Sequence, residues 1–484
     1  MLTRRASWLC RPAPPWVVRD ARRHEMGVSA PAYRRVEGIN AHLTASGSSP
    51  SAAPPHQYAV ALPEHLRDGD FSVYRNAGST SRLMTGFAMP FDNVKTLHDM
   101  WESTCGRHRD FPMFGTRFVG ADGTPGPYRW MTYKQSYDAR ACLSAGLLAS
   151  GVTPNDHVGL FSINCTEWCL LESAMTRVSL VSVPLYDTLG PDAVRFICNH
   201  AELSAVCVSA ACLPVLLDCL KHCPSVKLVV VYSHGGGAPA AVQRIPSDVK
   251  HACRLLSFEQ LVEIGKRKPC APFPPKVRVG PFPNPTSLFA HARLTLSFIY
   301  RKEHELATIC YTSGTTGDPK GVMLTNLNLV SNAAAYADDL DLGPQDTHVS
   351  YLPLAHIYER VTMLVCLFRG AKAGFFRGDV LGLLDDIAEL QPTVFCSVPR
   401  LWNRIYDKVQ AGIRDGGIVK QTMFKWAYAA KKKALEDGKP PPAVWEKIVF
   451  SKLREKLGGK ARISQPKSRH TVCAYKTDTF FCLS

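Results

Sequence analysis

The chain has 484 residues, of which 46% are hydrophobic and 20% are charged, and its formal net charge is +16. This length exceeds what one hydrophobic core supports, so two or three domains are expected. The longest uncharged apolar run, residues 205–217, is shorter than the roughly 20 residues that cross a bilayer. This argues against a transmembrane helix and leaves peripheral membrane contact open.

The positive charge is concentrated in residues 1–60, 276–302 and 461–484. The rest of the chain is nearly neutral, and it is expected to hold no basic helix with interleaved aromatic residues. No nucleic-acid partner is therefore expected. The seventeen cysteines show no CxxC spacing. Most have apolar neighbours, which indicates free thiols in a reducing compartment rather than disulfides or a zinc site.

Residues 1–57 are rich in Arg, Ser, Ala and Pro and are interpreted as a targeting extension or a disordered leader. Within this leader, "RVEGINAHL" resembles the N-terminal peroxisomal signal, with Arg35 and Val36 followed after five residues by His42 and Leu43. In a helix the two pairs lie two turns apart on one face, where an import receptor would bind residues 35–43. The alternative is a chance match in a leader of mitochondrial or plastid type. The peroxisome is the predicted location, with the endoplasmic reticulum or another membrane surface as the alternative.

Apolar periodicity begins near residue 58 and predicts alternating strands and helices. Strands are expected at residues 156–163, 179–186, 204–210 and 226–232, with helices at 166–178, 191–201 and 213–223. A second run predicts strands at 305–313, 348–354, 371–376 and 393–399, and helices at 325–340, 357–370, 380–391 and 400–409. Near-continuous apolar strands indicate parallel sheets covered on both faces. The expected fold is α/β, with two doubly wound, mostly parallel sheets covered by helices in one large N-terminal lobe.

The stretch "YTSGTTGDPKGV", residues 311–322, has the composition of a phosphate-binding loop without the Walker A spacing. It is expected to follow a strand and precede a helix, where open parallel sheets bind ligands. Its glycines, Gly321 included, let backbone N–H groups approach anionic oxygens, and its hydroxyl groups and lysine add donors and a positive charge. The predicted phosphate-binding residues are Thr312, Ser313, Gly314, Thr315, Thr316, Gly317 and Lys320. The alternative is a surface turn of glycine and threonine.

This stretch resembles the phosphate loop of the adenylate-forming enzymes, which include acyl-CoA synthetases, peptide-synthetase adenylation domains and firefly luciferase. A second segment, "YLPLAHIYER" at residues 351–360, is similar to the Leu-Pro-Leu-x-His motif that lines the acyl pocket in that family. Residues 186–194, 383–409 and 452–459 resemble the long-chain acyl-CoA synthetases, the peroxisomal ones most closely. The resemblance covers about residues 58–462, which are expected to form a partial AMP-binding domain.

The resemblance implies a reaction and a set of residue roles. The carboxylate of a long-chain fatty acid would attack the α-phosphate of ATP, and coenzyme A would then displace AMP from the acyl-adenylate. Lys320 and the loop would bind the β- and γ-phosphates, Thr312 would help to hold Mg²⁺, and His356 would stand beside the acyl carboxylate. A histidine merely satisfied by the core is the alternative for His356. Glu359 and Arg360 are interpreted as a charged helix surface, and residues 361–368 as the wall of an acyl tunnel or as core.

The sequence also departs from the family. Residues 277–305 resemble an unspliced or misassembled insertion, and residues 463–484 a non-homologous tail. Segments similar to the family's adenine and ribose sites, its hinge and its small C-terminal domain with a catalytic lysine are not found. The expectation is a long-chain fatty acid–CoA ligase, an ATP-dependent acid–thiol ligase, whose activity is impaired by truncation. The alternatives are an inactive truncated nucleotide-binding product and an adenylate-forming ligase for another carboxylic acid.

Overall fold

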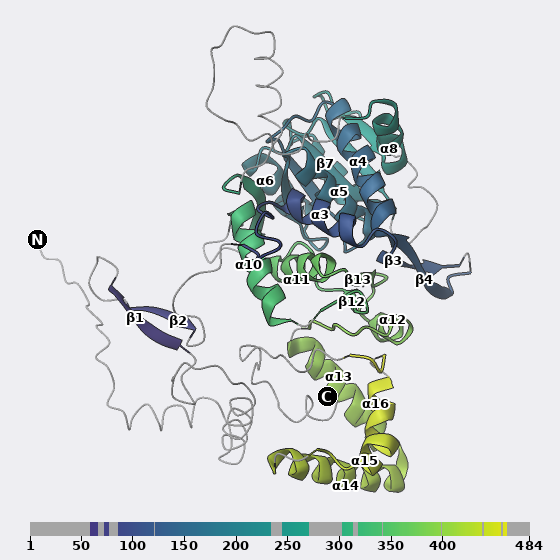
Figure 1. Cartoon of the computed structure of the whole chain (residues 1–484). Helices are drawn as coiled ribbons and strands as arrows, with labels where there is room; N and C mark the ends of the chain where they lie inside the picture. Colours follow the sequence, from purple (N-terminus) through teal and green to yellow (C-terminus); the bar gives the residue numbers. More distant parts are fainter. Residues whose placement is uncertain are drawn as a thin grey trace, which may run out of the picture. The chain divides into compact units, whose positions relative to one another are not determined.

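The computed structural model describes residues 59–65, 72–76, 86–120, 122–233, 244–270, 303–312, 318–340, 342–397, 399–437, 440–455 and 458–461. The chain divides into two compact units, one of residues 84–412 with 450–484 and one of residues 1–83 with 413–449. Figure 1 labels their helices and strands. The expected leader, nearly all of the expected insertion at 277–305, and the expected tail at 463–484 lie outside the described residues. Their boundaries stay predictions.

A seven-stranded sheet forms the centre of the larger unit, with the strand order β11-β10-β6-β5-β7-β8-β9. Its strands are β5 (His157–Phe161), β6 (Val181–Leu185), β7 (Ala205–Ser209), β8 (Leu228–Tyr232), β9 (Arg254–Ser257), β10 (Leu306–Thr312) and β11 (Lys320–Thr325). All neighbouring strands are parallel except β10 and β11, which are antiparallel. The expected strands between residues 156 and 232 are therefore confirmed as one parallel sheet.

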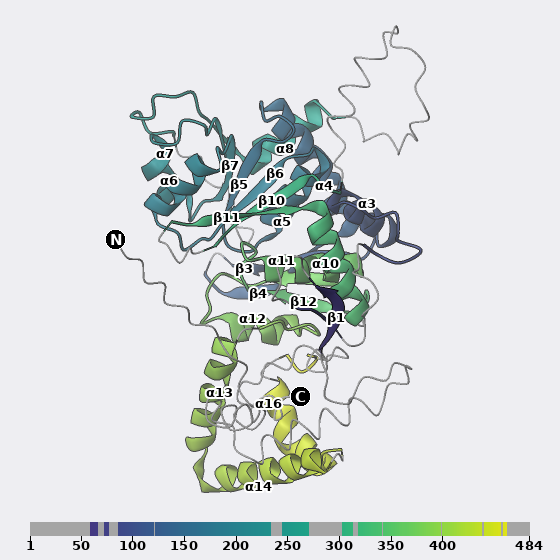
Figure 2. The ribbon, with the colours of Figure 1, turned by 90° about the vertical axis from the view of Figure 1, so that its left-hand side faces the viewer.

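Helices cover both faces of this sheet, as continuous apolar strands require. They are α4 (Tyr133–Ala149), α5 (Thr166–Arg177), α6 (Pro191–His200), α7 (Leu213–Leu220) and α8 (Phe258–Arg267). Alternate residues of β7 enter different cores: Ala205 and Cys207 pack with residues of α4, α5 and α8, and Val206 and Val208 pack with residues of α6 and α7. Figure 2 shows α6 and α7 on one side of the sheet and α4 and α8 on the other.

A smaller, four-stranded sheet belongs to the same unit and has the order β12-β13-β3-β4. Its strands are β3 (Pro112–Val119), β4 (Pro125–Thr132), β12 (Thr347–Ser350) and β13 (Lys372–Phe375). Helices α11 (Ile357–Phe368) and α12 (Leu383–Leu390) contact this sheet, and α3 (Leu97–Arg107) and α10 (Asn326–Asp339) pack against α11. β4 is antiparallel to β3, and the other pairs are parallel. The mixed α/β fold with two mostly parallel sheets agrees with the sequence expectation.

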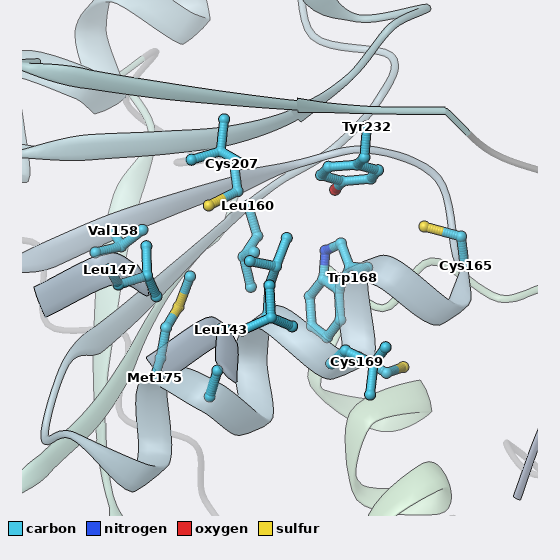
Figure 3. Packing of buried hydrophobic residues seen from close by; sticks show 14 of the residues in the cluster. Leu143, Leu147, Val158, Leu160, Cys165, Trp168, Cys169, Met175, Cys207 and Tyr232 are labelled. Atoms are coloured by element: carbon cyan, nitrogen blue, oxygen red, sulfur yellow. The ribbon is translucent and has the colours of Figure 1, made fainter. Parts of the chain in front are cut away.

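One core cluster includes side chains from both sheets. It combines Leu160 of β5 and Trp168 of α5 with Phe114 of β3 and Phe375 of β13. Figure 3 shows part of this cluster, in which Leu160 and Trp168 lie between Leu143 and Tyr232. Because both sheets bury side chains in the same core, their relative position within the unit is set by packing.

Two expectations about strands are wrong. The strand expected at residues 305–313, β10, was placed in the second run but pairs with β6 of the first sheet through Thr308 and Ser182. The strand expected at residues 393–399 is reduced, in the described residues, to one bridge between His348 and Val394. Both differences depend on which strand of the fold lies alongside, which is not encoded in local periodicity.

The remaining elements are helical, apart from the hairpin of β1 (Ala59–His65) and β2 (Ser72–Asn76). They are α13 (Pro399–Arg414), α14 (Gly417–Glu436), α15 (Ala443–Trp445), a π-helical turn η1 (Glu446–Phe450) and α16 (Ser451–Glu455). In the smaller unit, Lys431 of α14 and Glu446 of η1 form an ion pair of 2.8 Å. None of the helices that the structure describes is both long and apolar enough to cross a membrane.

Candidate functional site

The candidate phosphate loop is the turn of a hairpin at the edge of the seven-stranded sheet. Thr312, the last residue of β10, is paired with Lys320, the first residue of β11. Both side chains are exposed. The loop therefore leaves and re-enters the sheet at one point, and the two described residues that were predicted to bind phosphate flank it. Ser313, Gly314, Thr315, Thr316 and Gly317 lie outside the described residues.

The sequence analysis did not predict a strand between this loop and the helix that follows it. Residues 320–325 form β11, which pairs with the edge of β10 before the chain turns into α10. The expected start of the helix is confirmed, since the Thr325 hydroxyl accepts a hydrogen bond from the N–H of Asn328 and caps α10. The loop still lies at the carboxyl end of a parallel strand, where such sheets bind ligands.

Gly321 has a packing role in the hairpin. A Cβ atom at this position would lie 2.8 Å from Ile309 Cγ2 and 3.3 Å from the ring of Tyr311. Tyr311, the first residue of the motif, is buried, and its hydroxyl group forms a 2.6 Å hydrogen bond with Nδ1 of His200. Burial raises the pKa of Tyr311 to about 12. These contacts fix β10 and β11 next to the loop.

His356 is the N-cap residue of α11. Its Nδ1 accepts a hydrogen bond of 3.2 Å from the backbone N–H of Tyr358. The side chain is exposed, so the alternative of a histidine satisfied by the core is excluded. Because the cap uses Nδ1 as an acceptor, the neutral ring carries its proton on Nε2, which is then the nitrogen able to donate to a ligand.

Asn164 holds the segment that leads to His356. It follows β5, is 2% exposed, and donates from Nδ2 to the backbone oxygen of Leu352 at 2.6 Å and to Ser350 Oγ at 2.9 Å. Its Oδ1 accepts from the N–H of Leu354 at 2.8 Å. The side-chain amide of Asn164 thus ties the Leu-Pro-Leu segment of one sheet to the carboxyl end of a strand in the other.

Glu359 is buried, which corrects its interpretation as helix surface. It is 1% exposed, and its Oε1 lies 2.7 Å from Ser350 Oγ and 2.9 Å from His348 Nε2. Ser350 and His348 belong to β12. Glu359 therefore anchors the first turn of α11 to the strand that precedes it.

Arg360 is buried as well, with 3% of its surface exposed. Its guanidinium group forms an ion pair with Glu172 of α5 and donates a 2.8 Å hydrogen bond to Thr308 Oγ1 of β10. It also lies 3.3 Å from Ser182 Oγ of β6 and from Cys310 Sγ of β10. Burial lowers the pKa of Arg360, and the Glu172 carboxylate more than offsets this, so the pKa is raised. Arg360 is therefore charged and connects α11 to the strand that ends at Thr312.

The segments that carry His356 and Thr312, which were expected to act together, are thus connected through buried polar groups. His356 and Arg360 are one helical turn apart, and Thr308 and Thr312 lie on one strand. Sequence reasoning missed Asn164 and misplaced Glu359 and Arg360. The burial of Glu359 and Arg360 could have been predicted from their place at the start of the apolar stretch 361–368, because charged residues on a helix that is buried all round need buried partners. Residues of that stretch belong to the core clusters, which favours the core reading over a tunnel wall.

Magnesium was predicted at Thr312. The described residues hold no group of three or more His, Cys, Asp or Glu side chains suited to a metal ion. Mg²⁺ is usually held by only one or two protein oxygens together with phosphates and water. The exposed Thr312 hydroxyl at the end of β10 fits one such ligand, and no other described residue of the motif was predicted to bind the metal.

Comparison with curated proteins gives named relatives. The chain is 40% identical to long chain acyl-CoA synthetase 7, peroxisomal, of Arabidopsis thaliana, over 90% of this chain and 60% of the relative. It is 41% identical to long chain acyl-CoA synthetase 6, peroxisomal, of the same plant, over 88% and 58%. It is 34% identical to long-chain-fatty-acid–CoA ligase 1 of Cavia porcellus, over 77% and 49%. The chain therefore spans three fifths or less of the length of these relatives.

Comparison with solved structures supports the fold. The didomain of a carboxylic acid reductase from Segniliparus rugosus matches 76% of this chain and 48% of its own, with a TM-score of 0.57 and 18% identity. The adenylation domain of a carboxylate reductase from Mycobacterium chelonae matches 76% and 53%, with a TM-score of 0.55 and 20% identity.

A family model described as AMP-binding enzyme matches residues 101–469. This range includes both sheets of the larger unit, the hairpin loop between Thr312 and Lys320, and the capped helix that begins after His356. The chain belongs to the AMP-binding enzyme family.

Proposed function

We propose that this chain activates a long-chain fatty acid with ATP, as the acid-activating part of a fatty acid–CoA ligase. The observation that carries the proposal is the 40% identity over 90% of the chain to a protein named as a long chain acyl-CoA synthetase. The hairpin loop and the His356 segment, connected by Arg360 and Thr308, support it, because the reaction needs phosphate and carboxylate sites in fixed relation.

Lys320 and the loop bind the β- and γ-phosphates of ATP. The lysine projects a mobile positive charge beside hydroxyl and backbone donors, which together offset the repulsion between triphosphate and carboxylate. The paired ends of β10 and β11 hold both sides of the loop, and Arg360 holds β10 through its hydrogen bond to Thr308. Lys320 therefore acts on the phosphates directly, while Arg360 is a positioning residue.

His356 orients the acyl carboxylate. Its Nε2–H donates to one carboxylate oxygen, and the other oxygen attacks the α-phosphate, forming the acyl-adenylate and releasing pyrophosphate. The thiolate of coenzyme A then attacks the acyl carbon, forms the thioester and releases AMP. Mg²⁺, with Thr312 as one ligand, supplies additional charge neutralisation at the phosphates when bound.

The proposed location is the peroxisome. The two Arabidopsis relatives are named as peroxisomal, and residues 35–43 resemble an N-terminal peroxisomal signal. An import receptor that binds this signal is the proposed partner. Arg35, Val36, His42 and Leu43 lie outside the described residues, so this proposal rests on sequence.

The test is acyl-CoA formation by a ligase chimera, in which residues 1–461 are continued with the part of the Arabidopsis relative that this chain does not span. Palmitate, octanoate and benzoate are compared at equal ATP and coenzyme A. We expect palmitate to give the highest kcat/KM. A higher kcat/KM with benzoate or octanoate would refute the long-chain assignment, and no thioester with any acid would refute the ligase assignment.

A further inference from the structure

Helix α14 of the smaller unit exposes an apolar and basic face. Ile418 is 82% exposed, Val419 is 73% exposed and Trp426 is 64% exposed. Large apolar side chains with this exposure usually mark an interaction surface when they are grouped. Lys425 is exposed directly beside Trp426. This contradicts the expectation that the chain has no basic helix with interleaved aromatic residues.

These side chains recur at helical spacing. The positions 418, 422, 425, 426, 429 and 433 follow one another at intervals of one, three or four residues, so they lie along one side of α14. Five of them are exposed and Thr422 is half-buried. We call this side of the helix the outer face; it consists of Ile418, Thr422, Lys425, Trp426, Ala429 and Lys433.

The opposite side of α14 follows the positions 420, 424, 427, 431 and 434. It is exposed at Lys420, in the first turn, and packs inward from residue 424 onward. Ala427 is fully buried, and Lys431 is 3% exposed and paired with Glu446 of η1 at 2.8 Å. The packing of Ala427 and Lys431 therefore orients α14 and leaves Trp426 exposed.

We propose that the outer face of α14 binds the surface of an anionic phospholipid bilayer. Tryptophan prefers the headgroup region, where its ring meets the acyl boundary and its N–H remains hydrated. Lysines beside it bury their methylene stems and place the ammonium groups at lipid phosphates. No acidic residue stands at any of the six positions, so the charge of the face, from Lys425 and Lys433, is positive and complementary to negative lipid charge.

This inference goes beyond the proposed reaction, which requires no membrane surface. It adds a place where that reaction would meet its substrate, because a long-chain fatty acid partitions into bilayers. The two are separately testable: vesicle binding is measured without ATP or acid, so its failure leaves the ligase proposal untouched.

The experiment is co-sedimentation of the 484-residue chain with phosphatidylcholine vesicles that contain or lack 30% phosphatidylserine. Binding is expected only with phosphatidylserine. Lys425→Glu should weaken it about ten- to thirtyfold, since each basic residue near an anionic surface contributes about 1 kcal/mol, or roughly fivefold, and charge reversal counts about twice. Trp426→Ala should weaken binding severalfold.

The matched control is Lys420→Glu, which makes the same charge change at an exposed position on the opposite side of α14. The helix is about 10 Å wide and the Debye length is about 10 Å in 0.1 M salt, so its effect should stay below about threefold. Equal effects of Lys420→Glu and Lys425→Glu would refute the outer face, as would binding that Lys425→Glu leaves intact. Self-association that depends on Trp426 without vesicle binding would likewise refute the bilayer and indicate a second copy as the occupant.

Discussion

The buried guanidinium of Arg360 gives a sharp prediction about stability. Replacing it with Met removes the ion pair with Glu172, the 2.8 Å hydrogen bond to Thr308 and the contact to Ser182. Arg360 is 3% exposed, and the Glu172 side chain is 17% exposed, so the carboxylate is left without its cation in a largely water-free place. Removing one partner of such a pair costs about 3–5 kcal/mol.

Urea unfolding followed by tryptophan fluorescence measures this cost, and Trp168 lies beside the mutated group, with Arg360 Cζ 5.9 Å from its ring centre. The matched control is Lys134→Met, which breaks an exposed ion pair with Asp138 whose side chains are 48% and 57% exposed. This control should cost less than about 1 kcal/mol. The Arg360→Met/Glu172→Leu double variant should be more stable than Arg360→Met alone, because no carboxylate then remains unpaired.

A loss for Arg360→Met no larger than for Lys134→Met would show that Arg360 does not connect α11 to β10, and the reasoning about its buried network would fail. A double variant less stable than the single variant would show that the cost comes from lost packing rather than from an unpaired charge.

Three further predictions concern other parts of the chain. Burial, with a smaller contribution from the Arg140 cation, lowers the pKa of His98 to about 2. The stability that the neutral ring contributes is therefore fully present above pH 6.5 and falls below pH 6.5, where His98 of the unfolded chain gains a proton. Between pH 7 and pH 5, the free energy of unfolding of His98→Gln, measured with urea, should fall about 2 kcal/mol less than that of the unaltered chain. Asn164→Leu leaves the buried N–H of Leu354 and the carbonyl of Leu352 unpaired and should cost about 2–4 kcal/mol; an unchanged urea midpoint would contradict its role. A fluorescent fusion of residues 1–60 should enter peroxisomes and lose this location with His42→Asp; a cytosolic fusion, or an unaffected variant, would refute the signal.

Local sequence patterns predicted β5 to β8 and β10 of the larger sheet, but not its edge strands β9 and β11. Strands β5 to β8 are short, nearly uninterrupted apolar runs, and such runs are buried wherever they lie in a parallel sheet. The start of α10 was also predictable, because Thr325 followed three residues later by Asn328 is a local capping pattern. The hairpin of β3 and β4 was not predicted, because its residues are mostly half-buried and do not alternate regularly between buried and exposed, which gives a weaker signal than a continuous apolar run.

The site was less predictable because its support is not local. The partners of Arg360 lie in α5, β6 and β10, and Glu172 is 188 residues away in sequence. Two adjacent charged residues in a motif predict an exposed helix surface, and their buried partners become visible only in the fold. His356 and Lys320 were chosen from motifs, and their roles stay predictions. The outer face of α14 was missed because the sequence analysis predicted no helix over residues 417–436, and without the helix the spacing of its side chains has no meaning.

The most direct measurement of the central claim is palmitate-dependent exchange of pyrophosphate into ATP by the ligase chimera. Exchange reports acyl-adenylate formation alone, before coenzyme A takes part. It should require palmitate, and Lys320→Ala should slow it about ten- to a hundredfold, because one charge-assisted phosphate contact contributes roughly 1.5–3 kcal/mol. The exposed lysine control Lys134→Ala should leave the rate unchanged. Exchange that proceeds equally without palmitate, or that Lys320→Ala leaves intact, would contradict the account.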